Sequence, residues 1–209
     1  MMSAMPNALP GFGPHPVIVS LPGVDADDLV AACEVMWQEG LRTWSVPIDH
    51  LDTLTTLRGP FGRRAVVGVH GVTKASQGTM AAGAGATFIA APWVVRGLVK
   101  AAGDVPIIMG GFTPTEVAAA AAAGAAAVQV VPADALPPTY AYELPGLVGG
   151  IPLIATGGFG PDEAAEWLVA GAIGVWTTGL ASGEAVTDTD LDRLRSDCQA
   201  WQMDVGGVG

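Results

Sequence analysis

The sequence contains few of the residues that carry covalent or metal chemistry. It has two cysteines, Cys33 and Cys198, three histidines and, among nine basic residues, only two lysines. The cysteines form no Cys-x-x-Cys pair and no metal-ligand spacing, so we expect both to be buried free thiols. The shortage of basic residues leaves a net charge of −11. Such a surface repels nucleic acids and anionic membranes, and we expect neither as a partner.

Long hydrophobic runs are also missing. The longest apolar stretch, residues 117–128, is almost entirely alanine and glycine. It is too short and too weakly hydrophobic for a bilayer core of about 30 Å, and it predicts a helix packed closely on a sheet. Residues 1–16 have neither the basic region nor the apolar core of a secretory signal. We expect a flexible arm over residues 1–16 and a cytoplasmic protein.

What the sequence does contain is a regular alternation of short apolar runs and helical patterns. A chain of 209 residues, 50% hydrophobic and 14% charged, is long and apolar enough for one large core. The apolar runs predict strands at residues 17–21, 43–48, 65–70, 86–90, 105–109, 126–131, 151–155 and 173–178.

This alternation predicts the fold class. Repeated βα units imply an α/β protein with a parallel sheet and right-handed crossovers, and eight units in about 200 residues match a single (β/α)8 TIM barrel. We place the barrel at residues 17–203 and a tail at 204–209, with an open doubly wound sheet as the alternative. In such a barrel the functional residues lie at the C-terminal ends of the strands.

The motif ATGGFGPDEA follows the seventh predicted strand. Thr156, Gly157 and Gly158 end that strand and a helix begins near Pro161, so backbone N–H groups and a helix N-terminus point at one spot. This arrangement suits a phosphate, and the loops after the seventh and eighth strands hold one in many such barrels. The alternative is that the glycines only form a tight turn.

Three further polar residues follow the second and third strands. Asp49, His50 and His70 would lie near one another at the mouth of a barrel. They form either a divalent-metal set or a polar rim that faces water. We favour the rim because no recurring ligand spacing is visible, and we expect neither a metal nor another cofactor.

Three other residues near the predicted mouth are candidates. Lys74 follows the third strand, and it is either a solvated surface lysine or a nucleophile. Trp93, directly after Pro92, either packs against the fold or lines a ligand pocket. Gln129 is the one polar residue in the sixth apolar run. A lone buried amide lowers stability unless its hydrogen bonds are satisfied, so Gln129 is a candidate functional residue.

From residue 15 to about residue 181 the sequence resembles the 2-keto-3-deoxy-6-phosphogluconate (KDPG) and 4-hydroxy-2-oxoglutarate (KHG) aldolases, which are small (β/α)8 lyases. The matching motifs, in the order and spacing of the family, are PVIVSL, VVGVHGV, FIAAPW, MGGFT, VQVVPAD and ATGGFGPDEA. The resemblance implies a lyase-like enzyme, a small-molecule ligand with or without a phosphate group, and a homotrimer.

The resemblance also shows departures at the reaction centre. Gln129 stands where the family has its Schiff-base lysine, and an amide has no nucleophilic nitrogen. Ser45 replaces the family's general acid/base glutamate and Asp49 replaces its carboxylate-binding arginine. The family's threonine at the end of the third strand falls on Gly71.

Part of the family's binding site is retained. The Thr156-Gly157-Gly158 loop, Pro92 and the acid of the sixth-strand motif, Asp134, are all present. Gly110 lies in the motif that follows the fifth strand. The serine that helps the phosphate loop after the eighth strand corresponds to Gly179, with Thr178 beside it.

Two functions fit these observations. The first is an enzyme with altered chemistry that acts on a small keto or hydroxy acid without an imine. In it, Asp49, His50 or His70 acts as acid or base, and Gln129 binds a substrate carbonyl or hydroxyl. The second is a catalytically inactive aldolase homologue with a ligand-binding or assembly role, in which Gln129 is a satisfied core residue. We favour the enzyme.

Overall fold

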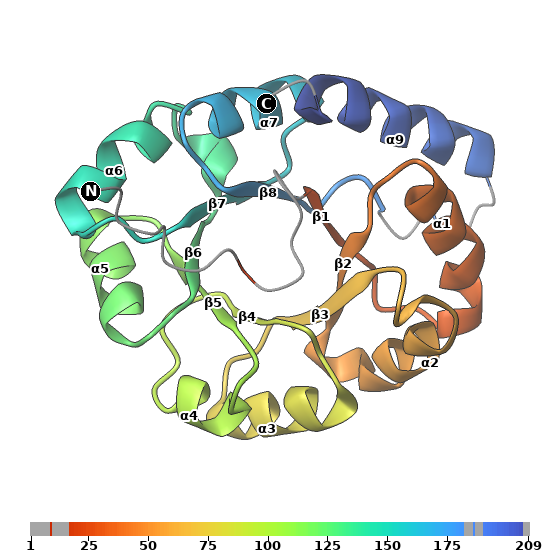
Figure 1. Ribbon diagram of the computed structural model, residues 1–209, viewed down its shortest axis with the longest axis horizontal. Helices are drawn as coiled ribbons and strands as arrows, with labels where there is room; N and C mark the ends of the chain where they lie inside the picture. The colour runs from red at the N-terminus through yellow and green to blue at the C-terminus, as the bar shows by residue number, and fades with distance from the viewer. Residues whose placement is uncertain (1–8, 10–16, 182–185, 187–189, 207–209) are drawn as a thin grey trace.

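The computed structural model describes residue 9, residues 17–181, residue 186 and residues 190–206. Eight parallel strands close into one barrel in sequence order, and helices surround it (Figure 1). The strands are β1 (Val17–Ser20), β2 (Thr43–Pro47), β3 (Val66–His70), β4 (Ile89–Ala91), β5 (Ile107–Gly111), β6 (Ala127–Val130), β7 (Leu153–Gly157) and β8 (Gly174–Thr177). The predicted (β/α)8 barrel is therefore confirmed.

The helices cover the outside of the strand ring. They are α1 (Ala26–Gln38), α2 (Leu51–Phe61), α3 (Ala75–Ala84), α4 (Leu98–Ala102), α5 (Pro114–Ala122), α6 (Tyr140–Val148), α7 (Pro161–Val169) and α9 (Leu191–Gly206), with short 3-10 turns η1 (Ile48–His50) and η2 (Ala133–Ala135). A capping box begins α5, in which Thr113 Oγ1 accepts from the N–H of Glu116, whose carboxylate accepts from the N–H of Thr113.

Several boundaries differ from those that the sequence predicts. β5 begins at Ile107 and β7 at Leu153, directly after Pro106 and Pro152. The carbonyls of both prolines accept from the N–H groups of neighbouring strands, but proline has no N–H to donate in return. Both strands then continue for two residues beyond the predicted ends. At the C-terminus, α9 runs to Gly206.

Inside the barrel, side chains are arranged in levels to which alternate strands contribute, as the register around the ring requires. The two levels nearest the N-terminal ends of the strands hold Thr43, Phe88, Ala127 and Gly174, then Ile18, Gly68, Ile108 and Ile154. The two levels nearest the C-terminal ends hold Ser45, Ala90, Gln129 and Trp176, then Ser20, His70, Gly110 and Thr156. Polarity therefore changes along the barrel axis.

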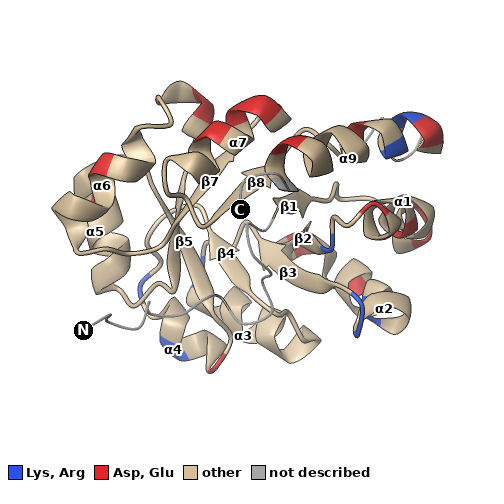
Figure 2. Cartoon of the chain, turned by 45° about the horizontal axis from the view of Figure 1, so that its top comes forward, with Lys and Arg blue, Asp and Glu red and all other residues tan. Residues whose placement is uncertain are grey.

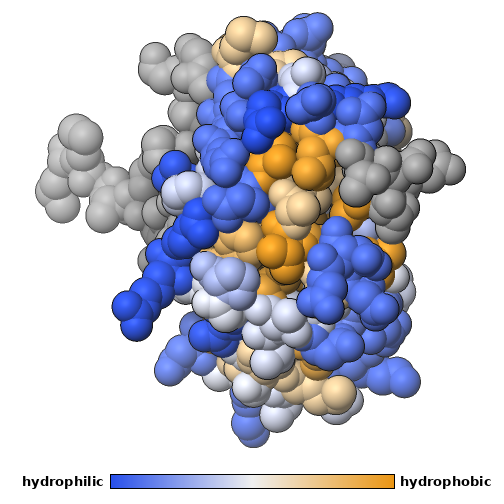
Figure 3. Space-filling model, turned by 90° about the vertical axis from the view of Figure 1, so that its right-hand side faces the viewer, coloured by the Kyte–Doolittle hydropathy of each residue, from blue (hydrophilic) through white to orange (hydrophobic). Residues whose placement is uncertain are grey.

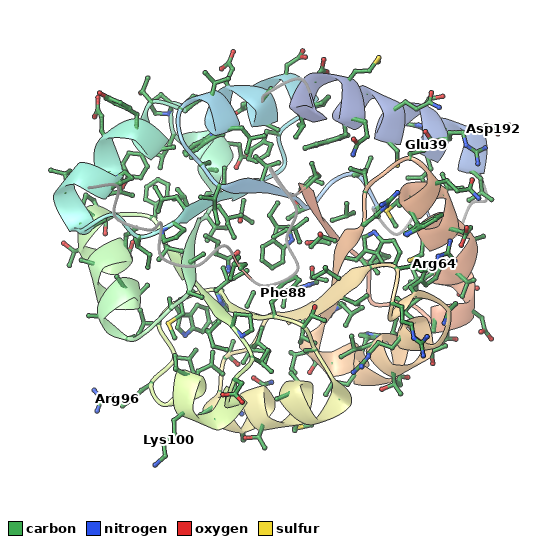
Figure 4. All side chains as sticks on the ribbon, viewed as in Figure 1. Glu39, Arg64, Phe88, Arg96, Lys100 and Asp192 are labelled. Atoms are coloured by element: carbon green, nitrogen blue, oxygen red, sulfur yellow. The ribbon has the colours of Figure 1, made fainter. Side chains whose placement is uncertain are left out.

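The lower levels form a closely packed apolar core. Phe88 is fully buried and lies inside the ring of strands (Figure 4). A Cβ on Gly68 would lie 2.4 Å from the Phe88 ring, so glycine at this position makes room for the phenyl group. Leu9, the one described residue of the expected N-terminal arm, is 1% exposed and packs into this inner cluster. The other residues of the arm lie outside the described part of the chain.

The outer surface is acidic, with local apolar areas. Acidic residues lie on α1, α6, α7 and α9, and the few basic ones include residues of α2, α4 and α9 (Figure 2). The face that carries α1 has an apolar centre bounded by hydrophilic surface (Figure 3). In the described part of the chain, no helix is both long and apolar enough to cross a membrane.

Candidate active site at the barrel mouth

The two upper levels of the barrel contain paired polar side chains. The hydroxyl of Ser45 lies 2.9 Å from Nδ1 of His70, and Nε1 of Trp176 donates to the Ser20 hydroxyl at 2.8 Å. The Trp176 indole also packs edge-on against the His70 imidazole, with ring centres 6.3 Å apart. Because β1, β2, β3 and β8 are neighbours in the barrel, these contacts hold the His70 ring from two sides.

His70 is neutral at neutral pH. Burial disfavours its charged form and lowers its pKa to about 4, although the Ser45 hydrogen bond opposes part of this shift. Among the described residues, its second ring nitrogen, Nε2, makes no hydrogen bond, and His70 is only partly buried. A neutral imidazole in this position can donate or accept a proton, depending on its tautomer.

Gln129 projects into the barrel from β6 and is 7% exposed. Its side-chain nitrogen donates to the backbone carbonyl of Ala91 at 2.8 Å, which fixes the direction of the amide. In the described part of the chain, the amide oxygen makes no hydrogen bond. The hydrogen bond to Ala91 explains how the strand tolerates this residue, and the oxygen remains available to a ligand.

Thr156 supplies the most unusual atom of the upper levels. It lies at the C-terminal part of β7 and is 5% exposed. Its hydroxyl is buried and has no hydrogen-bond partner. Leaving a buried hydroxyl unpaired costs about 1–3 kcal/mol, so such atoms require an explanation. A ligand that enters the mouth of the barrel would provide the missing partner.

The Thr-Gly-Gly loop continues from Thr156 to the start of α7. Both the N–H and the hydroxyl of Thr178 donate to the carbonyl of Gly157, at 3.2 and 3.3 Å, and the N–H of Gly179 donates to the Thr177 hydroxyl at 3.3 Å. A Cβ on Gly157 would lie 2.7 Å from Oδ1 of Asp134, so glycine allows the Asp134 carboxylate to approach the loop.

A hollow of about 310 Å³ lies beside this loop. Its lining includes Gly158, Gly160, Gly179, Thr177 and the carboxylate-bearing Asp197 of α9, and no lysine or arginine. A phosphate in this hollow would therefore depend on backbone N–H groups alone.

Asp49, His50 and Lys74 do not join the Ser45–His70 pair. Asp49 is an exposed residue of η1, and His50 precedes α2 with its ring against Gly23, where an added Cβ would lie 2.6 Å from the imidazole Nε2. Lys74 is exposed directly before α3. In the described part of the chain, no hydrogen bond or ion pair connects these side chains to His70, and no group of His, Cys, Asp and Glu residues has a metal-binding arrangement.

Pro92, Trp93 and Gly110 line a second hollow, of about 390 Å³, at the ends of β4 and β5. A Cβ on Gly110 would lie 2.0 Å from the Pro92 carbonyl oxygen, so this oxygen occupies the space that a side chain at position 110 would need. Trp93 is 56% exposed. The predicted pocket position of Trp93 therefore exists, but it lies outside the inner polar levels.

Three residues of this site were not singled out as functional candidates in the sequence. Ser20 and Thr177 accept hydrogen bonds in or beside the mouth, and Trp176 donates one. The alternation of β1 carries a weak signal for Ser20, which follows inward-facing Ile18 by two residues. The partner of Ser20 lies 156 residues away, so no local pattern predicts the pair.

Comparison with known proteins decides the family. The family model for KDPG and KHG aldolases matches residues 15–196. The chain belongs to the KDPG and KHG aldolase family. It is 27% identical over 173 residues to the 2-dehydro-3-deoxy-6-phosphogalactonate aldolase of Escherichia coli K12, which covers 80% of this chain and 83% of the relative. The family resemblance found in the sequence is therefore confirmed.

Solved structures agree on the fold of this aldolase-family chain. A native KDPGal structure superposes with a TM-score of 0.82 at 23% identity, over 92% of this chain and 95% of the other. The KDPG aldolase of Legionella pneumophila, solved with pyruvate as a covalent carbinolamine, superposes with a TM-score of 0.78 at 20% identity, over 89% and 93%. In this chain, by contrast, both lysines lie outside the eight strands.

Proposed function

We propose that this aldolase-family chain is an enzyme that acts on a small keto or hydroxy compound at the barrel mouth without forming an imine. Two observations carry the proposal: the Ser45–His70 hydrogen bond and the unpartnered Thr156 hydroxyl, both in the two levels nearest the C-terminal ends of the strands. Polar groups that converge in a concave, partly desolvated site are typical of a catalytic centre.

His70 serves as the acid or base in this proposal. Its Nε2 is the atom that exchanges a proton with the ligand, while Ser45 holds Nδ1 and thereby selects the tautomer. The Ser45 hydroxyl is already engaged with Nδ1 of His70, so in this proposal Ser45 positions His70 and does not itself bind the ligand. Gln129 and Thr156 would bind the oxygens of the ligand.

The imine-free chemistry follows from the positions of the lysines. Lys100 points away from the barrel on α4 (Figure 4), and Lys74 is exposed before α3. A Schiff-base lysine needs a desolvated position that favours its neutral form, and neither residue has one. The correspondence of Gln129 with the family's lysine, of Ser45 with its glutamate and of Asp49 with its arginine supports the same proposal.

Proton exchange tests the enzymatic proposal. Pyruvate, hydroxyacetone and glyceraldehyde would be incubated separately in D2O, and loss of the proton signal next to the carbonyl followed by NMR. We expect exchange with at least one compound, reduced about 100-fold or more in His70→Gln and unchanged in Lys100→Gln. Because the pKa of His70 is about 4, the rate should be constant above about pH 5.

Exchange no faster than buffer with all three compounds would contradict the proposal. In that case the chain would be an inactive aldolase homologue that binds a ligand or serves assembly. The Ser45→Ala variant refines the test. It should alter the pH profile and the tautomer of His70, visible in ring ¹⁵N shifts, and leave the fold intact.

We further propose that the Gly157–Gly160 loop can hold a phosphate group of the ligand. Glycine at position 158 has open space around it, with the nearest carboxylate oxygen of Asp134 at 4.0 Å from an added Cβ. Gly158→Asp would place a second carboxylate at the anion site and should abolish binding of a phosphorylated ligand. Unchanged affinity would remove the phosphate from the proposal. The homotrimer implied by the family resemblance also stays a prediction, which sedimentation equilibrium tests.

A further inference from the structure

We propose that the inner site takes an uncharged hydroxy-carbonyl compound, of the class of small aldoses and ketoses, and excludes 2-keto acids. The inference rests on the proposed function for the location of the ligand, and it concerns the charge of the group that enters the barrel. It departs from the keto or hydroxy acid that the family resemblance implies.

The first observation is the placement of positive charge. All nine lysines and arginines lie in the described part of the chain and outside the eight strands. Several are already engaged elsewhere: Arg64 pairs with Glu34, Arg195 pairs with Glu39, and Arg58 donates to the carbonyls that end α3. Arg96 points outward from the edge of the molecule (Figure 4). A carboxylate inside the barrel would therefore meet no cation.

The second observation is that the polar groups of the upper levels are all uncharged. Ser20, Ser45, Gln129 and Thr156 carry hydroxyl or amide groups, and the lowered pKa of His70 keeps its ring neutral. The side chains of Ser45, Gln129 and Thr156 are each more than nine-tenths buried. A carboxylate that loses its water in such surroundings requires a charged partner, whereas a hydroxyl or carbonyl requires only a hydrogen bond.

The third observation is an unpaired donor. The Thr156 hydroxyl is buried without a partner in the upper levels, and among the described residues neither the Gln129 oxygen nor His70 Nε2 makes a hydrogen bond. A vicinal hydroxy-carbonyl group presents a donor and an acceptor to such a set. In a 2-keto acid the carboxylate is bonded to the keto carbon, so the carbonyl cannot enter without the charge. At the rim, exposed Asp49 and Asp134 add repulsion.

The proposal is tested with two matched pairs of probes: hydroxyacetone with pyruvate, and D-glyceraldehyde with D-glycerate. Each would be titrated into the full chain at neutral pH into the high millimolar range, a suitable range for such small ligands. Binding is read from the Thr156 methyl and His70 ring signals in ¹H–¹³C NMR spectra. We expect saturable shifts with the uncharged member of each pair and at least tenfold weaker binding of the acid.

A shape-preserving variant assigns the binding to Thr156. Thr156→Val removes the hydroxyl and retains the branched side chain, so it should weaken binding of the uncharged probes about three- to tenfold, as the loss of one hydrogen bond implies. Thr87→Val is the matched control, because Thr87 is exposed, lies outside the mouth and bonds only the Val67 carbonyl. It should leave binding unchanged.

Three results would overturn the proposal: acids that bind as tightly as the uncharged probes, no binding of any probe, or wild-type affinity in Thr156→Val. Binding of the uncharged probes together with absent proton exchange would leave this proposal standing and remove the enzymatic one. Proton exchange on pyruvate alone, together with tight binding of pyruvate, would remove this proposal and leave the enzymatic one standing.

Discussion

The two halves of the barrel interior differ in polarity and in packing. The lower levels, around Phe88, Ile108 and Ile154, are buried and, apart from Thr43, apolar, and the absence of a side chain at Gly68 makes room for the Phe88 ring. The upper levels contain hydroxyl, amide and imidazole groups, one of which has no partner. Both halves are built from the same strands. Every second residue of a strand points inward, so the difference comes only from the residue types at successive inward-facing positions.

This comparison indicates where stability and function reside. Close packing without voids supplies stability, whereas unpaired or partly paired polar groups lower it and are retained where they bind something. We therefore expect substitutions in the lower half to change the free energy of unfolding more than binding, and substitutions in the upper half to do the opposite.

The largest expected effect is in the lower half. Phe88→Ala removes a fully buried ring that packs edge-on against Trp176 at 5.8 Å between ring centres. It should lower the free energy of unfolding by about 3–5 kcal/mol, measured by urea denaturation. Binding of an uncharged probe well below the melting temperature should remain. Loss of binding at temperatures where the variant is folded would contradict the assignment of stability to the lower half and of binding to the upper half.

The pH dependence of stability comes next. The pKa of His70 is about 4 in the folded chain and near 6.5 in an unfolded one, so the unfolded chain binds this proton first as the pH falls. The contribution of neutral His70 is complete above about pH 6.5 and is lost progressively toward pH 4, by up to about 3 kcal/mol. The stability of His70→Gln should fall less over this window. Parallel stability curves for the two proteins would contradict the lowered pKa.

A smaller effect, of opposite sign, is expected at Thr156. Replacing the unpaired hydroxyl by a methyl group in Thr156→Val should raise the free energy of unfolding by about 1 kcal/mol, because the desolvation cost of the hydroxyl is removed. Thermal denaturation without ligand measures this change. A clearly destabilised variant would show that the hydroxyl has a structural partner and weaken its assignment to a ligand.

The smallest expected effect on stability is at Gln129. Gln129→Leu loses one hydrogen bond to the Ala91 carbonyl and gains apolar burial, so its stability should stay within about 0.5 kcal/mol of the wild type. Its binding of uncharged probes should nevertheless weaken. Unchanged binding and unchanged stability together would make Gln129 a satisfied core residue, as the inactive-homologue alternative requires.

The fold and the family could be predicted because their signals are local or ordered along the chain. Apolar runs of strand length locate all eight strands, and the Thr-Gly-Gly motif marks the end of β7. The exact strand limits were harder, because β5 and β7 begin only after Pro106 and Pro152. Whether a missing proline N–H shortens a strand depends on how that strand pairs with its neighbour, which the sequence alone does not give.

The candidate site was only partly predictable. Ser45 and His70 were both candidates, but their hydrogen bond joins two strands and reaches across 25 positions. Asp49 and His50 have the same residue types as a catalytic pair, yet they lie in η1, after the end of β2, and in the described part of the chain neither is hydrogen-bonded to His70. Within a strand, the alternation of residue types predicts the direction in which each side chain points. After the strand ends in a turn, the alternation no longer predicts it.

The most direct test of imine-free chemistry is intact-mass analysis after borohydride treatment with pyruvate and, separately, with a phosphorylated 2-keto acid. Borohydride fixes any imine between a lysine and a keto compound as a stable adduct, and the KDPG aldolase of Legionella pneumophila, solved with pyruvate as a covalent carbinolamine, serves as the positive control. For this chain we predict an unchanged mass with both compounds. A stoichiometric adduct that maps to Lys74 or Lys100 would contradict the account, because it would show that a lysine outside the strands forms the covalent bond.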